Sequence, residues 1–102
     1  MSTEKTCVKG QTTCKVKFLL NKEAGSSKKS AFLVGDFNDW NKQATPMKKM
    51  KDGSFTVTLT LQKGRKYQYR YLLDGTVWEN DWKADGYIPT QYGDGDNSVV
   101  AV

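Results

Sequence analysis

Apolar and polar side chains alternate with a period of two in three separate stretches, and this feature constrains the fold more than any other. The stretches are residues 14–20, 55–61 and 67–73, in which Val, Leu, Phe and Tyr alternate with Thr, Lys, Gln and Arg. A period of two is typical of a β-strand with one buried and one solvated face. No stretch of the chain has helical periodicity of comparable length. The sequence therefore predicts an all-β protein.

Turn signals divide the remaining sequence into short pieces. Asp52-Gly53, Lys63-Gly64 and Asp74-Gly75 separate apolar stretches, and residues 80–97 read as an irregular segment. Further short strands are expected at residues 31–34, around 48–49, near Trp78 and at 98–102. About seven short strands with turns every 8–12 residues predict an immunoglobulin-like antiparallel β-sandwich. Residues 1–12 are expected to form an N-terminal extension or a first short strand, and residues 13–102 the domain.

Charge is distributed unevenly along the 102 residues. Residues 1–73 contain 15 Lys and Arg against 5 acids, a net of +10, whereas residues 74–102 contain one Lys against six acids, a net of −5. Fourteen of the 16 basic residues are Lys, and they are scattered, which is typical of a solvated surface rather than a nucleic-acid site. We expect no nucleic-acid partner.

Several kinds of chemistry are disfavoured. The chain has no His, so His-based triads and His metal ligands are excluded. A carboxylate pair for catalysis would have to come from Asp36, Asp39, Asp74, Glu79, Asp81, Asp85, Asp94 and Asp96. Most of these acids lie beside Gly, Asn or Trp, where Asp bonds the local backbone. A calcium site from Asp94, Asp96 and Asn97 lacks the length and closing Glu of an EF-hand loop. We expect no enzyme activity, no metal and no cofactor.

The N-terminus and the two cysteines bear on location. The first ten residues lack the apolar core of a signal peptide, and the longest apolar run, residues 31–34, is too short to cross a membrane. We expect a soluble cytoplasmic protein without a membrane partner, if residue 1 is the native start. Cys7 and Cys14 are expected to be small apolar residues of early strands. A bridge between them around Gly10 is geometrically possible but not expected in a reducing cytosol.

Two tryptophans are placed where a core does not usually hold them. Trp40 follows Asn38-Asp39 at a turn, and Trp78 follows Asp74-Gly75. A sugar ring stacks its C–H face on an aromatic plane, and its hydroxyls need polar groups beside that plane. Arg70, with outward parity on the intervening strand, would supply such a group. The alternative is that one or both tryptophans cover the end of the sandwich, but two in separate turns favour a binding platform.

A set of motifs resembles a known family. The segments are VGDFNDWN (34–41), ATPM (44–47), DGSFTVTLTL (52–61), YQYRYLLDG (67–75) and DNSVVAV (96–102). In this order they resemble the family 48 carbohydrate-binding module, which is the glycogen-binding domain of the AMP-activated protein kinase beta subunit and the N-terminal domain of isoamylases and branching enzymes. The resemblance covers residues 13–102. It implies an early-set immunoglobulin-like fold.

The resemblance also implies a binding site. Trp40 matches the first stacking Trp, Arg70 the basic residue that bonds sugar hydroxyls, and Asn97 the Asn near the last strand. The second stacking Trp usually comes two residues after Asp-Gly. Here Trp78 comes one residue later, and Trp82 is a rival for the role. The family's apolar loop residue is replaced around Tyr92 and Gly93.

These observations together lead to a functional prediction. We expect a monomeric, non-catalytic module that binds an alpha-1,4-linked glucan of the glycogen or starch type, or maltooligosaccharides. The alternative is a protein-interaction module of the same fold that acts in trans on a glycan-metabolising enzyme or a kinase-like partner.

Overall fold

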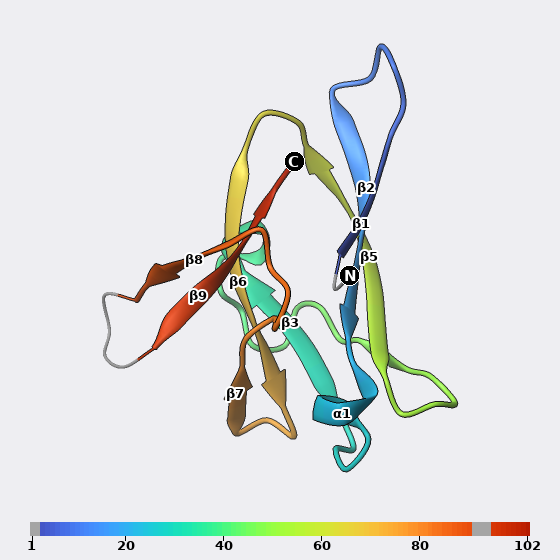
Figure 1. The fold of residues 1–102 in the computed structure, drawn as a ribbon, viewed down its shortest axis with the longest axis vertical. Coiled ribbons are helices and arrows are strands. Elements are labelled where there is room, and N and C mark those ends of the chain that lie inside the picture. The colour runs from blue at the N-terminus through green and yellow to red at the C-terminus, as the bar shows by residue number, and fades with distance from the viewer. Residues whose placement is uncertain (1–2, 91–94) are drawn as a thin grey trace.

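Two antiparallel sheets pack face to face (Figure 1). The computed structural model describes residues 3–90 and 95–102. The elements in chain order are β1 (Thr3–Cys7), β2 (Thr13–Leu20), α1 (Lys22–Gly25), β3 (Ala31–Gly35), the 3₁₀ turn η1 (Asp36–Asn38), β4 (Lys48–Lys49), β5 (Phe55–Gln62), β6 (Lys66–Leu73), β7 (Val77–Glu79), β8 (Gly86–Pro89) and β9 (Asp96–Ala101). One sheet has the order β1-β2-β5-β4, and the other has the order β3-β6-β9-β8, with β7 also paired to β6. The predicted immunoglobulin-like antiparallel sandwich is confirmed.

The core lies between the sheets and is built from the alternating stretches. Val16 and Phe18 of β2 and Tyr69 and Tyr71 of β6 are completely buried. The Phe18 ring meets the Tyr69 ring edge-on, with 5.1 Å between the centroids, a favourable geometry for two aromatic quadrupoles. Inward side chains of β2 and β6 thus join the two sheets, and the alternate residues of β6 are left to form the outer face of the second sheet.

The structure adds elements that periodicity did not predict. Nine strands are present among the described residues rather than about seven, and β8 lies inside the segment expected to be irregular. β8 is a four-residue edge strand that ends at Pro89, and among the described residues it pairs only with β9. Because it is so short and lies at the edge, its sequence shows no alternation of apolar and polar residues. The short helix α1 is likewise fixed by a local signal, because the Asn21 Oδ1 accepts the backbone N–H of Ala24 at 2.9 Å.

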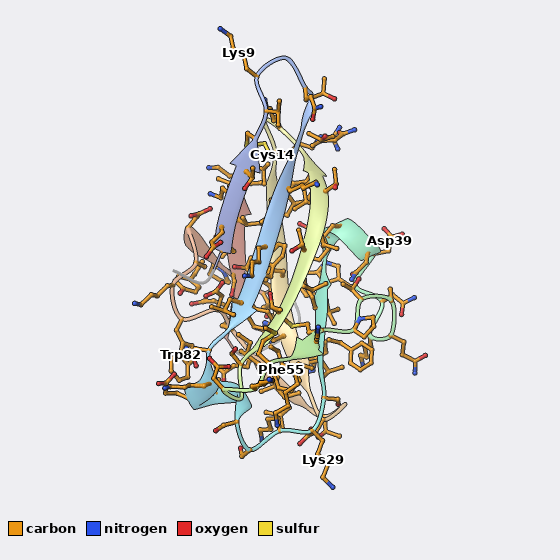
Figure 2. All side chains as sticks on the ribbon, turned by 90° about the vertical axis from the view of Figure 1, so that its right-hand side faces the viewer. Lys9, Cys14, Lys29, Asp39, Phe55 and Trp82 are labelled. Carbon is orange, nitrogen blue, oxygen red and sulfur yellow. A yellow bond between two sulfur atoms is a disulfide. The ribbon has the colours of Figure 1, made fainter. Side chains whose placement is uncertain are left out.

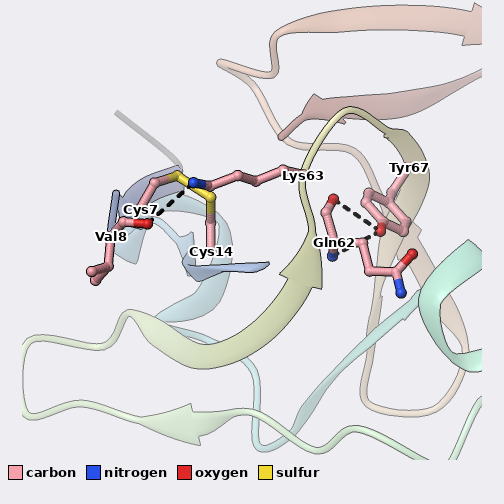
Figure 3. The surroundings of a disulfide bond; sticks show 6 residues. All are labelled: Cys7, Val8, Cys14, Gln62, Lys63 and Tyr67. Carbon is pink, nitrogen blue, oxygen red and sulfur yellow. Dashed lines mark hydrogen bonds between the residues drawn. A yellow bond between two sulfur atoms is a disulfide. The ribbon is translucent and has the colours of Figure 1, made fainter. Parts of the chain in front are cut away.

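A disulfide joins Cys7 and Cys14, which corrects the expectation of two unpaired cysteines. The two residues are direct cross-strand partners at the ends of β1 and β2, so antiparallel pairing itself brings their Cα atoms to 4.4 Å. Figure 3 shows the bridge beside Lys63, whose ammonium donates to the carbonyl of Val8 at 3.2 Å. The edge strand β1, included in the expected extension 1–12, is therefore fastened at its C-terminal end.

The helical content is small throughout the described residues. Within them, no helix is of sufficient length and apolar character to span a bilayer.

Candidate functional site

The outer face of the β6 sheet brings three predicted residues together. Arg70 is the Cα partner of Val34, and the β6–β9 register places Asn97 opposite Arg70 on the other side. Trp78 is the Cα partner of Leu72, two residues along β6 from Arg70. Cross-strand partners project to the same side of a sheet, as do residues two apart on one strand. One face of the sheet consequently holds Arg70, Trp78 and Asn97, together with Gln68. We call this surface the β6 outer face.

Trp40 reaches the rim of this face through a strained turn. Asp39 and Trp40 have φ angles of 56° and 57°, in the left-handed region that bulky residues rarely adopt. Two hydrogen bonds hold this conformation: the Trp40 backbone N–H donates to the Gly35 carbonyl at 2.9 Å, and its indole Nε1 donates to Asp36 Oδ1 at 2.9 Å. Such strain persists only where the surroundings impose it, and it is commonest at functional sites. The half-buried Trp40 ring is therefore fixed in place.

A chain of hydrogen bonds connects Trp40 with Asn97. Asp36 uses its second oxygen, Oδ2, to accept the backbone N–H of Gln68 at 2.7 Å. The Gln68 side-chain Oε1 in turn accepts the Asn97 Nδ2 at 3.1 Å. Trp40 and Asn97, 57 positions apart in sequence, are thereby linked through Asp36 of η1 and Gln68 of β6.

Trp78 lies at the other side of the face and is 39% exposed. Leu73 pairs with Val77, so the turn takes three residues, and positive φ angles at Asp74 (51°) and Gly75 (75°) close it. This turn accommodates the residue by which Trp78 comes later than in the family motif. The Trp78 side chain therefore still lies on the outer face. The Lys42 ammonium lies 5.8 Å from the centroid of the Trp78 ring, a cation–π contact that connects the loop after Trp40 with Trp78.

Arg70 is anchored to the backbone at the start of β9. Its Nε donates to the carbonyl of Asp96 at 2.9 Å, and the Asn80 Nδ2 donates to the same oxygen at 2.6 Å. None of the hydrogen bonds found within residues 3–90 and 95–102 involves the terminal nitrogens of Arg70. A guanidinium held by Nε can direct its remaining N–H donors toward a ligand.

Trp82 lies elsewhere. It is 54% exposed, and its indole Nε1 donates to Glu79 Oε1 at 3.0 Å. Glu79 pairs with Tyr71, an inward-facing residue, and Trp82 lines a small pocket with Leu19 and Leu20 of the first sheet. Figure 2 shows Trp82 and Asp39, the neighbour of Trp40, at opposite edges of the sandwich. Of the two rivals, Trp78 is the one that shares the face of Arg70.

A buried carboxylate fixes the segment that carries Trp82 and Asn80. Asp81 is only 2% exposed, and its Oδ2 accepts the hydroxyls of Tyr69 at 2.6 Å and Tyr71 at 3.5 Å. Burial, followed by the neighbouring Tyr71 and Asp81, raises the pKa of Tyr69 far above its ordinary value. Burial and Asp81 likewise raise the pKa of Tyr71. Both tyrosines consequently remain neutral donors to the carboxylate.

The other acids considered for catalysis mostly accept hydrogen bonds within the fold, as do the side chains of Asp36, Asp74, Glu79, Asp81 and Asp85. Several of these bonds come from distant parts of the chain rather than from the local backbone: Asp74 accepts from Lys29, and Asp85 from Lys5. No cluster of three or more acidic or Cys side chains that would suit a metal ion occurs in the described ranges. Asp94 of the considered calcium site lies outside the described residues, as do Tyr92 and Gly93.

Three residues of the face were not predicted from sequence. Asp36, Gln68 and Lys42 fix or contact the predicted residues, yet each looks like an ordinary polar surface residue in the sequence. One local signal existed: Asp36 lies four residues before Trp40, within reach of its indole N–H. The pairing of Gln68 with Asn97 depends on strand register, which sequence alone does not provide.

The comparison with known families agrees with this geometry. Residues 14–88 match the model of carbohydrate-binding module 48, the isoamylase N-terminal domain. The matched range contains Trp40, Arg70 and Trp78 and ends before Asn97. No curated protein matches the chain. A match over most of the sequence, on a sandwich of the expected kind, shows that the chain belongs to the family 48 carbohydrate-binding modules.

Proposed function

We propose that the β6 outer face binds an alpha-1,4-linked glucan of the glycogen or starch type, and that the module acts without catalysing a reaction. The observation that carries the proposal is the shared face of Arg70, Trp78 and Asn97, to whose rim Trp40 is tied by the hydrogen bonds through Asp36 and Gln68. Family membership supports a glycan as the ligand. That the glycan is an alpha-1,4-linked glucan is our proposal.

The chemistry of the face suits a neutral sugar chain. Two indole rings offer apolar planes for the C–H faces of glucose units. Arg70 and Asn97 share the face of Trp78 and can bond hydroxyls. Because Trp40 and Trp78 approach from different strands and are held by separate contacts, successive glucose units can stack on separate rings. A chain of several glucose units, such as an alpha-1,4-glucan, is the kind of ligand that can use two aromatic platforms.

The Trp40→Ala variant tests the site. A buried aromatic platform can contribute ~2 kcal/mol or more, whereas a typical net hydrogen bond contributes ~1 kcal/mol. We expect Trp40→Ala to weaken maltoheptaose binding by roughly thirtyfold, at 1.4 kcal/mol per tenfold. Arg70→Ala and Asn97→Ala should each cost less, because water can partly replace the lost bonds.

Titration calorimetry on folded variants, checked by thermal melts, makes the measurement. If Trp40 merely covers the end of the sandwich, Trp40→Ala will lower the melting temperature and leave the affinity of the folded protein unchanged. Retention of the parent on a glycogen or amylopectin affinity gel tests the function without any variant, and a parent that is not retarded contradicts it.

A second candidate is a protein-interaction module that acts in trans on a glycan-metabolising enzyme or a kinase-like partner. It is favoured by the edge strand β8, on which Tyr87 and Ile88 are both exposed apolar residues. An edge strand with free backbone groups can pair with a strand of another protein. A parent protein that is not retarded by glucan but co-purifies with such an enzyme through β8 would favour this candidate.

A further inference from the structure

Trp82 is the most exposed large apolar residue of the described chain, and the β6 outer face does not use it. It lies on the edge of the sandwich opposite the Trp40 loop (Figure 2). A fully solvated indole costs free energy, since its large apolar surface would be more stable when buried. An exposed Trp that is also fixed in position needs an explanation other than core packing.

One hydrogen bond holds the Trp82 ring, and two others hold the backbone beside it. Its indole Nε1 donates to Glu79 Oε1 at 3.0 Å, as the Trp40 indole donates to Asp36 Oδ1 at 2.9 Å. The preceding residue, Asp81, is buried and anchored: its backbone N–H donates to Ser98 Oγ at 2.8 Å, and its Oδ1 accepts the Lys83 N–H at 3.0 Å. Backbone on both sides of Trp82 is thus held, and the ring is oriented before any ligand arrives, which lowers the entropy cost of binding.

The surroundings of Trp82 combine apolar surface with polar side chains. A shallow depression beside the ring is lined by residues of both sheets and of the loop before α1: Leu19, Leu20, Asn21, Tyr71, Asn80 and Asp81. The Asn80 amide already bonds Asp96 and Ser98, so the polar border of the ring consists of Glu79, which accepts the indole N–H, and Asn21. An aromatic plane with polar groups at its border is the arrangement that a sugar ring requires.

We propose that Trp82 forms a second, separate glucan-binding site, so that one module can hold two glucan chains at opposite edges. This inference rests on the proposed function of the β6 outer face and extends it. Trp78 and Trp82 are only four residues apart, but Trp78 contacts Lys42 from the Trp40 loop, whereas Trp82 lies beside Leu19 and Leu20 of the other sheet. Two sites with this placement make the module a cross-linker of branched glucan.

The first test follows the three indole N–H signals by NMR during titration with maltotriose, a ligand too short to bridge the two edges. Single Trp→Phe variants assign the signals. We expect the Trp82 signal to shift with its own saturation curve, and to do so equally in the Trp40→Ala variant. A Trp82 signal that does not move, or that moves only when Trp40 is present, overturns the second site.

The second test measures glycogen. Two linked sites raise the apparent affinity for a multivalent ligand by roughly 10²–10⁴ over a single site. We expect Trp82→Ala to weaken retention on immobilised glycogen by at least about tenfold and to abolish glycogen-dependent turbidity, while maltotriose binding at Trp40 persists. Val8→Ala, which removes an apolar residue of similar exposure (53%) at the β1–β2 tip, is the matched control.

The outcomes separate the two proposals. If neither the Trp40 nor the Trp82 signal responds to maltotriose or maltoheptaose, the proposed glucan function fails. If Trp40 responds and Trp82→Ala behaves as Val8→Ala does, the glucan function stands and the second site is wrong.

Discussion

At the scale of single residues, Asp36 has the most distinct task on the β6 outer face. One carboxylate oxygen accepts the Trp40 indole N–H, and the other accepts the Gln68 backbone N–H. The residue does not need to touch a sugar, because its effect is to hold the ring that does. It is therefore a positioning residue for the proposed site.

Replacement of Asp36 should release the Trp40 ring. Immobilising one side chain on binding costs ~1 kcal/mol, so Asp36→Ala is expected to weaken maltoheptaose binding by about fivefold with little change in melting temperature. Asp36→Asn keeps an oxygen acceptor for the indole and should retain most of the affinity. Fluorescence anisotropy decay of Trp40, in a Trp78→Phe/Trp82→Phe background, reports the freedom of the ring. Equal anisotropy decay in Asp36→Ala and the parent would show that Asp36 does not orient it.

Asp74 makes stability depend on pH. Its Oδ1 accepts the backbone N–H groups of Lys29 at 2.7 Å and Ser30 at 3.1 Å. The hydrogen bond from Ser30, followed by the one from Lys29, lowers the pKa of Asp74 in the folded state. The nearby charges of Lys28 and Lys29 lower this pKa further. A depressed folded pKa stabilises the protein above the unfolded value of about 3.9, and this contribution is lost as pH falls through the folded pKa.

The expected result is a melting temperature that falls on acidification below about pH 4, with a shallower fall in Asp74→Asn. Asp39→Asn is the matched control, since its carboxylate makes no hydrogen bond among the described residues. Melts at a series of pH values, recorded for the parent and both variants, make the comparison. Parallel curves for the parent and Asp74→Asn would mean that Asp74 does not contribute.

At the scale of elements, the disulfide determines how firmly β1 is attached. β1 is an edge strand in which every residue after Thr3 is exposed, and the bridge closes a short loop between Cys7 and Cys14. The loop-entropy relation gives about 2.5 kcal/mol for eight residues. We expect reduction, or Cys7→Ser, to lower the melting temperature by roughly 10–20 °C, at 4–8 °C per kcal/mol.

The loss should be local. Hydrogen exchange is expected to accelerate in β1 and the β1–β2 tip, whereas β5 and β6 in the middle of their sheets stay protected. Cys7 is exposed and Cys14 is buried, so a substitution at Cys7 breaks the bridge without placing a hydroxyl in the core. Unchanged melting and exchange after complete reduction would contradict this account of β1.

Elements also show what sequence can predict. The strands β2, β5 and β6 were predictable because each has one face in the core, which imposes alternation. The strand β8 was not, since an edge strand is defined by its partner β9 rather than by its own side chains. The Cys7–Cys14 bridge was missed for a related reason: the expected cellular location was weighed above the cross-strand geometry, which depends on β1 being a strand.

The same distinction holds for the candidate site. Trp40, Arg70, Trp78 and Asn97 were proposed from residue type and resemblance, and their shared face follows from strand parity and register. The connecting hydrogen bonds through Asp36 and Gln68 depend on three-dimensional neighbours that sequence does not contain.

At the scale of the whole molecule, part of the basic charge lies on the sheet opposite the β6 outer face. Lys15 and Lys17 of β2 project outward from the other sheet, where their cross-strand partners are Thr60 and Thr58 of β5. Threonines separate the lysines on this face. The edge strands β1 and β4 of the same sheet also carry Lys5, Lys48 and Lys49, and charged residues on an edge strand hinder unwanted strand pairing. A net charge of +5 is then a surface property rather than the footprint of an anionic ligand.

Salt dependence tests this assignment. A nucleic-acid complex releases counterions, so its affinity would fall steeply with salt, whereas a neutral glucan has no such term. We expect maltoheptaose affinity to change by less than about twofold between about 50 and 300 mM NaCl, and DNA or RNA binding to be weak and to disappear over the same range. Calorimetry at both salt concentrations measures the first, and fluorescence polarisation with mixed-sequence oligonucleotides measures the second. Because Lys15 and Lys17 lie on the sheet opposite the β6 outer face, Lys15→Gln/Lys17→Gln should reduce any residual RNA binding and leave maltoheptaose binding intact. Tight RNA binding that persists at the higher salt concentration would instead make the basic sheet a functional surface.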